Sequence, residues 1–375
     1  MITLKNLFAS ALLLSSLLSY SQRQMVFFGS YNWDKNKPGL YVYELNHNNG
    51  KLKKITSLKG VVNPSYLTVS ANGKYIYSVT DSKLENEGSV SSFAFDEEKG
   101  SLQFLNKQKS YGENPVYVSV DKSEKWLANA NYTEGSVSIY PILENGKIGE
   151  LAQNITYYEG SRATKRQMES HVHSVVFSPN NDQLLLADLG ADEIKIYPFN
   201  SANKKPLDKE KVSIIKTVSG SGPRHLLFNK KGDILYGIEE ISGTISVFKY
   251  ENKTLIPIQK IATHPESLLN GFEASDIHIS PDNRFVYASN RGSENNLAIF
   301  KILSNGKLEH VGYQSVHGKH PRIFAIDETG NFVIVTNVKT QNVVVFRRNT
   351  ETGLLKKVGR KIRITNASCV KTKIY

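Results

Sequence analysis

The chain of 375 residues contains a single cysteine, Cys369. One cysteine excludes an intrachain disulfide, so the stability of the fold must come from the packing of its core. The sequence also lacks a Gly-x-Ser-x-Gly elbow, a Walker loop and a His-Glu-x-x-His pair. These absences exclude the usual signatures of α/β-hydrolases, P-loop nucleotide enzymes and zinc proteases.

Helical periodicity is absent as well. No segment after the first 21 residues carries apolar side chains at the 3.6-residue spacing of an amphipathic helix. No linker, low-complexity stretch or change of composition divides the chain. The sequence therefore predicts an all-β protein that forms one domain.

What the sequence does contain is a repeat of about 50 residues. Six units each hold a β-branched run, a turn, a second run, a Gly-centred turn and a third run. The last residues of the six first runs are 51, 57, 51, 51 and 47 positions apart. Short strands at this period are typical of propeller blades with four antiparallel strands, here named a to d from the centre outward. The predicted a strands are residues 63–70, 114–121, 171–178, 222–229, 273–280 and 320–327.

The two ends of the chain predict the number of blades. Residues 25–31, 40–44 and 52–58 have the pattern of strands b, c and d without a strand a, whereas residues 366–373 have the pattern of a lone strand a. Joining them gives a seventh blade made from both termini, which closes the ring and hides the edges that an open sheet would expose. The prediction is a seven-bladed β-propeller of four-stranded blades in a single domain, residues 22–375.

The first 21 residues differ from the rest. Lys5 precedes an uncharged, mostly apolar stretch at 7–18, and small residues follow at Ser19 and Ser21. This order is typical of a cleavable secretory signal peptide, and the stretch is too short for a stable membrane span. We therefore expect residues 1–21 to be removed, no stable membrane insertion, and a mature protein that is periplasmic or secreted.

The balance of charge is basic, with 47 Lys and Arg against 35 Asp and Glu and a formal net charge of +12. Such a balance favours anionic partners, such as acidic small molecules, polysaccharides or membrane headgroups. Basic clusters at 204–205, 347–348 and 356–363 are interpreted as solvated surface. Basic and aromatic residues are not interleaved, so we expect no nucleic-acid partner. We expect a monomer or a weak homodimer.

The repeat also predicts where the unusual polar residues gather. Strands a and b of a blade are antiparallel, so the start of each a and the end of each b lie at one mouth of the central channel. The a-strand starts supply His171, His173, Arg224, His225, His320 and Arg322. The b-strand ends supply Asp81, Asn131, Asp188, Glu240, Arg291 and Asn337. Such a mouth suits a small anionic ligand, because guanidinium groups bind carboxylate or phosphate with two hydrogen bonds.

No metal site is expected at this mouth. We expect His171 and His173 not to face one ion together. We also expect the protein to need no cofactor.

Several segments resemble a known family. They are His-Val-His-Ser-Val-Val-Phe-Ser-Pro at 171–179, Ala-Asp-Leu-Gly-Ala-Asp at 187–192, Gly-Ser-Gly-Pro-Arg-His at 220–225, Ser-Asp-Ile-His-Ile-Ser-Pro-Asp at 275–282, Ala-Ser-Asn-Arg at 288–291 and Pro-Arg-Ile-Phe-Ala-Ile-Asp at 321–327. In this order they resemble the seven-bladed lactonase family, which includes the propeller type of 6-phosphogluconolactonase and the fungal carboxy-cis,cis-muconate cyclase. The resemblance covers essentially the whole mature chain.

The resemblance implies hydrolysis, or in the cyclase branch formation, of a small carboxylated, phosphorylated or sugar-derived lactone. By motif, the catalytic residues of the family fall on His173, Arg224, Glu240 and Arg291. We hypothesise that Glu240 or His173 activates a water while the two arginines stabilise the oxyanion. The predicted substrate-binding residues are Arg322, His225, His171 and Asn131.

Two segments depart from the family pattern. Glu239 stands where relatives commonly have Asn, and Ile323 stands in Pro-Arg-Ile-Phe where they often have a second Asn. We expect Glu239 either to raise the proton affinity of Glu240 or to point into solvent.

An alternative from another class is a non-catalytic propeller that binds a glycan or a protein partner outside the cytoplasm. Fold alone does not establish chemistry. Tyr31, Trp33 and Tyr132 are aromatic residues that such a scaffold would expose on its rim. An enzyme would instead bring the four family residues within reach of one small molecule.

Overall fold

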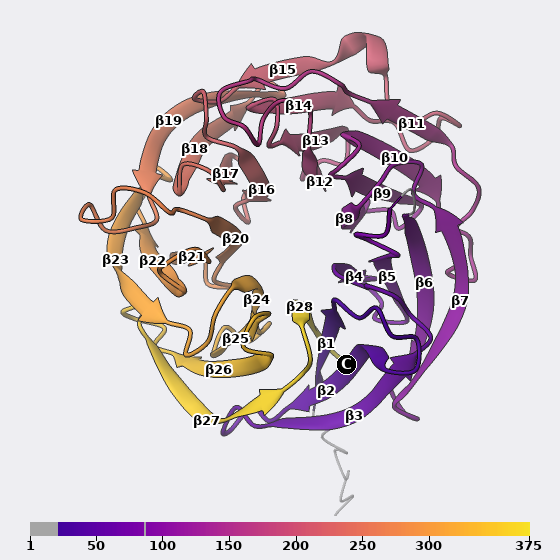
Figure 1. The fold of residues 1–375 in the computed structure, drawn as a ribbon, viewed down its shortest axis with the longest axis vertical. Helices are drawn as coiled ribbons and strands as arrows, with labels where there is room; N and C mark the ends of the chain where they lie inside the picture. The colour runs from indigo at the N-terminus through magenta and orange to yellow at the C-terminus, as the bar shows by residue number, and fades with distance from the viewer. Residues whose placement is uncertain (1–21, 86–87) are drawn as a thin grey trace, which may run out of the picture.

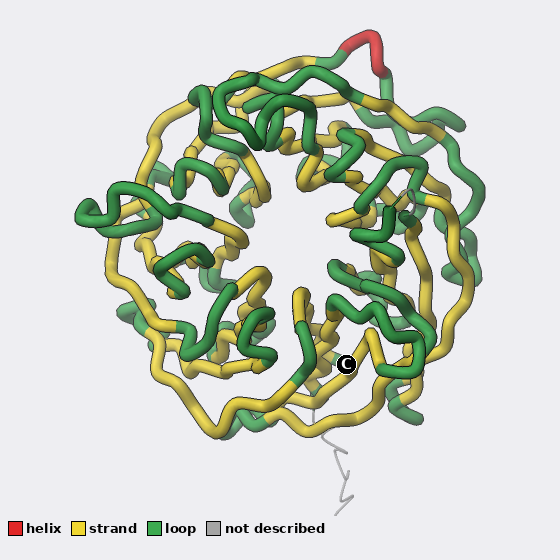
Figure 2. Tube along the Cα trace, in the orientation of Figure 1, coloured by secondary structure: helices red, strands yellow, loops and turns green. Residues whose placement is uncertain are grey.

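The structure is a computed structural model that describes residues 22–85 and 88–375. The predicted signal segment, residues 1–21, lies outside the described residues. Seven four-stranded antiparallel sheets stand around a central axis (Figure 1). The only helix in the described ranges is a 3-10 turn at Lys209–Lys211, drawn red in Figure 2. The prediction of an all-β, seven-bladed propeller is therefore confirmed.

The blades are numbered here in the order of their outer strands. Blade 1 contains β28 (Ala367–Ile374), β1 (Gln24–Ser30), β2 (Pro38–Leu45) and β3 (Leu52–Lys59). Blade 2 contains β4 (Leu67–Val69), β5 (Tyr75–Thr80), β6 (Ser89–Asp96) and β7 (Ser101–Lys109). Blade 3 contains β8 (Pro115–Val120), β9 (Trp126–Asn131), β10 (Ser136–Pro141) and β11 (Gln153–Thr156).

The remaining four blades follow the same order from the axis outward. Blade 4 contains β12 (Val172–Phe177), β13 (Gln183–Asp188), β14 (Glu193–Pro198) and β15 (Ser213–Lys216). Blade 5 contains β16 (Pro223–Phe228), β17 (Ile234–Glu239), β18 (Thr244–Glu251) and β19 (Thr254–Ala262). Blade 6 contains β20 (Ala274–Ile279), β21 (Phe285–Asn290), β22 (Asn296–Ile302) and β23 (Leu308–Ser315). Blade 7 contains β24 (Pro321–Ile326), β25 (Phe332–Asn337), β26 (Asn342–Arg348) and β27 (Leu355–Arg363).

Blade 1 closes the ring with strands from both ends of the chain. The C-terminal strand β28 is its innermost strand and pairs antiparallel with β1, from Gln24 opposite Ile374 to Ser30 opposite Ala367. Figure 1 shows the yellow β28 beside the indigo β1. The predicted blade shared between the termini is present, and it joins the two chain ends by backbone hydrogen bonds.

The core fills the space between neighbouring blades. Tyr236 of β17 and Tyr287 of β21 are fully buried and occupy the same position in successive blades. The Tyr236 hydroxyl donates to the Gly306 carbonyl at 2.8 Å, and the Tyr287 hydroxyl donates to the Gly353 carbonyl at 2.6 Å. Each acceptor lies in the hairpin before the outer strand of the next blade, so these tyrosines fix one blade against the next while satisfying their own polar group.

Exposure rises from the axis to the rim. The second strands, such as β13 and β25, are buried along their whole length, whereas nearly all residues of the outer strands β7 and β27 are exposed or partly buried. No helix in the described ranges is long and apolar enough to cross a membrane.

Candidate active site

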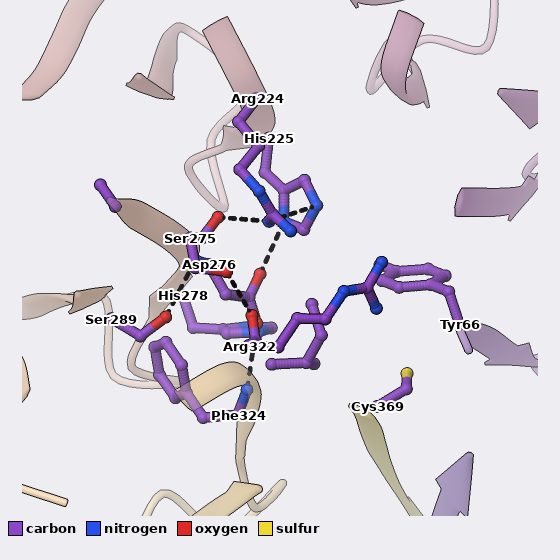
Figure 3. Close-up of polar contacts among 12 residues, drawn as sticks. Tyr66, Arg224, His225, Ser275, Asp276, His278, Ser289, Arg322, Phe324 and Cys369 are labelled. Carbon is purple, nitrogen blue, oxygen red and sulfur yellow. Dashed lines mark hydrogen bonds and ion pairs between the residues drawn. The ribbon is translucent and has the colours of Figure 1, made fainter. Parts of the chain in front are cut away.

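Several inner strands have a break in their hydrogen-bond register near their first residue, and the side chain at the break points toward the axis. In β12 the register shifts between Val172 and Ser174, which leaves His173 outside the ladder. The corresponding breaks in β16 and β24 contain Arg224 and Arg322. A bulge redirects the extra residue of a strand. Figure 3 shows Arg224 and Arg322 pointing from their strands toward the centre.

The turn before each inner strand is hydrogen-bonded to the residue that follows the second strand of the same blade. Gly222 has a φ of 65°, a conformation that glycine adopts without steric cost. Its carbonyl accepts the N–H of Glu240, the residue that follows β17, at 2.8 Å. The equivalent bond joins Val338 to the His320 carbonyl at 3.1 Å. The residue immediately after each second strand is thereby held beside the start of the inner strand; these residues are Tyr31, Asp81, Tyr132, Leu189, Glu240, Arg291 and Val338.

Glu240 is the anionic centre of this region. One carboxylate oxygen, Oε2, lies 2.8 Å from Arg224 Nε and 2.7 Å from Arg291 Nη2. The other, Oε1, lies 2.5 Å from Arg166 Nη2. Although burial raises the pKa of Glu240, Arg291, Arg224 and Arg166 together lower it well below its ordinary value. Glu240 is therefore a carboxylate that holds three guanidinium groups in place.

Arg224 is connected on its other side to a buried histidine and aspartate. Arg224 Nη1 donates to the Ser275 carbonyl at 2.5 Å and lies 2.9 Å from His225 Nε2. His225 Nδ1 lies 2.8 Å from Asp276 Oδ1, and Asp276 Oδ2 lies 2.9 Å from His278 Nε2. Figure 3 shows this row of side chains along β16 and β20. The row orients Arg224, since His225 can accept from the arginine only while its proton stays on Nδ1.

Arg322 crosses from blade 7 toward blades 1 and 2. Its Nη1 donates to the Ser65 carbonyl at 2.8 Å and to the Ser368 carbonyl at 3.3 Å. Its guanidinium carbon lies 5.4 Å from the centre of the Tyr31 ring, which also carries Lys83 Nζ at 4.0 Å. Burial raises the pKa of Tyr31, but Arg322 and Lys83 outweigh it, so the phenol has a lowered pKa.

His173 lies opposite this arginine cluster. Its ring contacts His225 and Tyr132 edge to face, with centroids 5.3 and 5.4 Å apart. His171 stacks on the Tyr132 ring at 4.5 Å and its Nδ1 lies 2.8 Å from the Tyr132 carbonyl. Burial and then the charge of Arg224 lower the pKa of His173 well below its ordinary value. His173 is therefore a neutral imidazole in the unliganded protein.

Two buried polar atoms of the cluster have no protein partner. Arg224 Nη2 and His173 Nδ1 are both inaccessible and make no hydrogen bond with any described residue. Burial and then repulsion by Arg291 lower the pKa of Arg224 to about 10, as expected for a guanidinium with too little compensating negative charge. Buried polar groups are nearly always paired, so the cluster has hydrogen-bonding capacity that the described residues do not fill.

Comparison with known proteins places the chain in a family. The model described as lactonase, 7-bladed beta-propeller, matches residues 25–372. The chain belongs to this lactonase family. The family resemblance predicted from the sequence is thereby confirmed.

Named relatives cover almost the whole chain. The 6-phosphogluconolactonase of Formosa agariphila is 37% identical over 352 residues, which are 93% of this chain and 99% of the relative. The 6-phosphogluconolactonase of Bacillus subtilis is 29% identical over 336 residues, 89% of this chain and 94% of the relative. Among solved structures, the periplasmic gluconolactonase of Pseudomonas aeruginosa superimposes with a TM-score of 0.89 at 30% identity and covers 94% of this chain and 99% of its own.

The four residues that match the family motifs come together in the propeller. Arg224 and Arg291 contact Glu240 directly. The His173 ring contacts the ring of His225, which in turn contacts Arg224. Arg322 also faces the axis, whereas His225 lies behind Arg224 and His171 packs on Tyr132. Of the predicted residues, those that face the axis are therefore His173, Arg224, Glu240, Arg291 and Arg322.

Asn131 does not face the axis. Its amide donates to the Ser110 carbonyl at 3.0 Å and to Ser136 Oγ at 2.9 Å, and its oxygen accepts from Asn129. The next residue, Tyr132, faces the axis instead. Asp188 and Asn337 are bound inside their blades in the same way. In these three blades the predicted residue therefore lies one position before the residue that follows the second strand.

The expectation for Glu239 was wrong on both counts. Glu239 is buried rather than solvated, and its carboxylate binds Lys260 Nζ at 2.7 Å and Ser246 Oγ at 2.8 Å. Because successive residues of a strand point to opposite faces, Glu239 faces the blade interior while Glu240 faces the axis. Its charge is compensated by Lys260, and the pKa of Glu240 is lowered, not raised.

Arg166 and Asp276 were not predicted from the sequence. Arg166 lies in the connection between β11 and β12, which is anchored by buried Gln167 through the Leu189 carbonyl at 2.9 Å. The signal was the repeat spacing of 57 residues instead of 51 at this point. Asp276 lies in a quoted family segment, but nothing in the sequence shows that it bonds His225.

The described residues contain no group of three or more His, Cys, Asp or Glu side chains that could hold a metal ion. That the protein needs neither metal nor cofactor stays a prediction from the sequence.

The neutral histidines of this lactonase-family propeller predict acid sensitivity. Burial, followed by Arg224 for His225 and by Arg291 for His320, lowers the pKa of each to about 3. Between that value and the ordinary pKa of about 6.5 the unfolded chain binds more protons, so stability is lost as the pH falls. We expect the melting temperature to drop between pH 7 and pH 5. The unfolding free energy should fall by at most about 1.4 kcal/mol per pH unit for each histidine.

A pair of variants tests this prediction. His320→Asn should show a shallower loss of melting temperature on acidification, and the exposed His310→Asn should keep the wild-type slope. Thermal denaturation followed by circular dichroism at several pH values gives both slopes. Equal slopes in the two variants would show that His320 does not drive the acid sensitivity.

Proposed function

We propose that the protein hydrolyses a small sugar-derived lactone, such as gluconolactone or its 6-phosphate, at the arginine cluster around Glu240. The observation that carries this proposal is the arginine cluster around Glu240, with Arg224 at 2.8 Å and Arg291 at 2.7 Å, beside the neutral imidazole of His173. The family and its relatives support lactone hydrolysis: two curated relatives are named 6-phosphogluconolactonase, and one structural relative is a gluconolactonase.

The reaction needs a base, an oxyanion site and an acid for the leaving oxygen. Neutral His173 accepts a proton from a water, whose oxygen bonds to the lactone carbonyl carbon. Arg224 and Arg291 stabilise the negative charge that develops on the carbonyl oxygen. When the ring C–O bond breaks, the protonated His173 returns its proton to the departing oxygen, which yields the hydroxy acid.

Glu240 serves as an anchor and not as the base. A carboxylate that binds three arginines has little affinity for a proton. Without its charge, four cations would remain close together, since Arg166, Arg224, Arg291 and Arg322 all border the site. Glu240 therefore keeps the guanidinium groups in the positions where they can meet an oxyanion.

An anionic substrate also increases the proton affinity of the proposed base, His173. Burial and then the positive charge of Arg224 disfavour protonation of His173. A bound phosphate or carboxylate that offsets the charge of Arg224 therefore raises the pKa of His173. The cluster thus favours lactones that carry a negative group, with Arg322 as a further ligand for it.

We further propose that the protein acts in the periplasm or is secreted, with residues 1–21 as the signal. The support is the sequence of these residues together with the periplasmic gluconolactonase of Pseudomonas aeruginosa among the structural relatives. A periplasmic site favours unphosphorylated gluconolactone, and the relatives named 6-phosphogluconolactonase favour the phosphate ester.

A pH-indicator assay of residues 22–375 with gluconolactone and 6-phosphogluconolactone tests the activity and ranks the two substrates. We expect acid release above the spontaneous rate. No release with either substrate would refute this proposal. Lactone formation from a muconate would then favour the cyclase branch, and its absence would favour the non-catalytic propeller.

Arg166 is expected to contribute to substrate binding. Arg166 is half exposed and bonds Glu240 and the Tyr132 hydroxyl through a single nitrogen, so its other nitrogens can bind the substrate. Arg166→Gln should raise KM for 6-phosphogluconolactone about tenfold, with a smaller change for gluconolactone and little change in kcat. Steady-state kinetics with both lactones measure the effect.

Arg162→Gln is the matched control, because Arg162 lies on the same connection and its guanidinium pairs with exposed Glu159 at 3.3 Å, outside the arginine cluster. This variant should keep wild-type kinetics. A KM increase of the same size in both variants would mean that general charge, and not the contact of Arg166, governs binding.

A further inference from the structure

Basic residues gather on the outer strands of two neighbouring blades. These strands are β3 of blade 1 and β27 of blade 7, and neither contains Asp or Glu. Their eight exposed cations are Lys53, Lys54, Lys59, Lys356, Lys357, Arg360, Lys361 and Arg363. These eight residues are called the basic rim surface below.

The two strands form one continuous surface. A groove of about 360 Å³ lies between them, lined on one side by Lys51 and Leu52 and on the other by Val358 and Arg360. Arg347 of β26 spans the same junction and donates to the Asn48 carbonyl at 2.5 Å. Figure 1 shows β27 and β3 following one another along the lower edge of the ring, away from the axis.

The cations of the basic rim surface are not neutralised by the protein. None of the eight forms an ion pair with a carboxylate in the described part of the chain. Two lysines on other outer strands do: Lys107 of β7 lies 2.9 Å from Asp81, and Lys260 of β19 lies 2.7 Å from Glu239. The positive potential of β3 and β27 is therefore available to a partner.

Protection of sheet edges does not account for this distribution. Lysines on outer strands prevent edge-to-edge aggregation, and every blade has such an edge. Yet β11 and β23 contain no Lys or Arg at all. Edge protection therefore does not explain why the positive charge is concentrated on the two adjacent outer strands β3 and β27.

A polar groove continues the surface at the end of β27. It measures about 400 Å³ and is lined by three cations, Lys339, Lys361 and Arg363, and by Thr340, Gln341 and Asn342. No carboxylate lines it. Ammonium, guanidinium and amide donors together suit an acidic group flanked by hydroxyls.

We propose that the basic rim surface binds a linear acidic polysaccharide. Its charges follow the length of β27, which spans about 30 Å, as a polymer with repeating carboxylate or sulfate groups requires. Neither strand carries an aromatic residue on which the bases of a single-stranded nucleic acid could stack. Their apolar residues, such as Val358 and Ile362, are partly buried in the grooves and do not extend toward a lipid surface.

Such binding would leave the axis of the propeller open. The basic rim surface lies on the outer edge, whereas the arginine cluster around Glu240 lies at the centre. A polysaccharide could thus hold the enzyme in place while small lactones reach the central site. The two functions are separable by mutation.

Fluorescence anisotropy with labelled heparin, a sulfated polysaccharide, tests the proposal on residues 22–375. The variant combines Lys356→Gln, Lys357→Gln, Arg360→Gln and Lys361→Gln. Its matched control combines Lys204→Gln, Lys205→Gln, Lys209→Gln and Lys211→Gln, four exposed residues on blade 4. Both proteins lose the same net charge, and circular dichroism checks that both remain folded.

We expect the β27 variant to bind heparin at least about tenfold more weakly with a shallower salt dependence, and the control to bind like the wild type. Lactone turnover should be equal in all three proteins, so a failure of heparin binding is distinguishable from a failure of the proposed enzyme activity. Equal weakening in variant and control would show that only net charge matters and would overturn the proposal. Tighter binding to single-stranded DNA or to anionic vesicles than to heparin would overturn the assigned partner class.

Discussion

Replacing Arg224 with methionine is expected to lower kcat/KM for lactone hydrolysis about 100- to 1000-fold while the propeller stays folded. Arg224 is the fully buried guanidinium of the central site, and its Nη2 has no protein partner in the described chain. In the proposed reaction this donor stabilises the oxyanion, an interaction that a thioether cannot supply. Methionine has similar length and leaves no large cavity.

The fold should tolerate this change. Glu240 keeps Arg291 at 2.7 Å and Arg166 at 2.5 Å, so its carboxylate remains paired after Arg224 is removed. The change removes the donor of the Ser275 carbonyl and of His225, which costs stability. It also removes the burial of a guanidinium that Arg291 and Arg322 repel, which offsets that cost. The melting temperature of Arg224→Met should therefore lie close to the wild-type value, as measured by thermal denaturation.

Arg348 provides the control for loss of a buried arginine. It is equally buried, pairs with Asp282 at 2.6 Å and donates to the Gly330 carbonyl, but it lies on β26, away from the axis. Arg348→Met should lower the melting temperature and leave kcat/KM unchanged. If instead Arg224→Met keeps wild-type kcat/KM, the central arginine is structural and the assigned site is wrong.

The fold could be predicted almost completely from the sequence. The repeat fixed the number of blades, and the incomplete units at both ends required the shared blade that β28 and β1 form. This succeeds because each blade is one copy of the same hydrophobic pattern and has to stack on its neighbours to bury it. The insertion before β12 was visible only as a longer spacing, since an irregular connection has no periodic pattern.

The site could be predicted only to within one residue. The period identified the ends of the second strands, but the sequence does not show which of two successive residues turns to the axis. Asn131 and Tyr132 illustrate this, because a shift of one residue moves a side chain to the opposite face of the sheet. Glu239 and Glu240 illustrate it again, with two adjacent carboxylates bound to different partners.

Side-chain contacts between blades could not be predicted from the sequence. Arg166 meets Glu240 across 74 positions of the chain, and His225 meets Asp276 across 51. The second pair is exactly one repeat apart in strand position, so neighbouring inner strands bring equivalent residues together. The repeat thus contained the geometric information, but which equivalent pairs form bonds depends on side-chain packing at the axis.

His173→Gln is expected to lower kcat by about 100- to 10,000-fold with little change in KM. Burial and then the charge of Arg224 keep the imidazole neutral. Its ring lies 5.3 Å from the His225 ring, and its Nδ1 has no hydrogen-bond partner among the described residues. Glutamine keeps a polar side chain in place but cannot take up a proton near neutral pH. Activity at the residual level would then come from the oxyanion site alone.

The pH profile separates this role from a structural one. Burial and the charge of Arg224 keep His173 unprotonated well below pH 6.5, because they lower its pKa. Wild-type kcat/KM should therefore persist on acidification through pH 6.5, where an ordinary histidine base would already be losing activity. His317→Gln, at an exposed position in a turn, is the control and should match the wild type. A His173→Gln enzyme with more than half of the wild-type kcat would assign proton transfer to another group, and Tyr31, with its lowered pKa beside Lys83 and Arg322, is the residue to replace next.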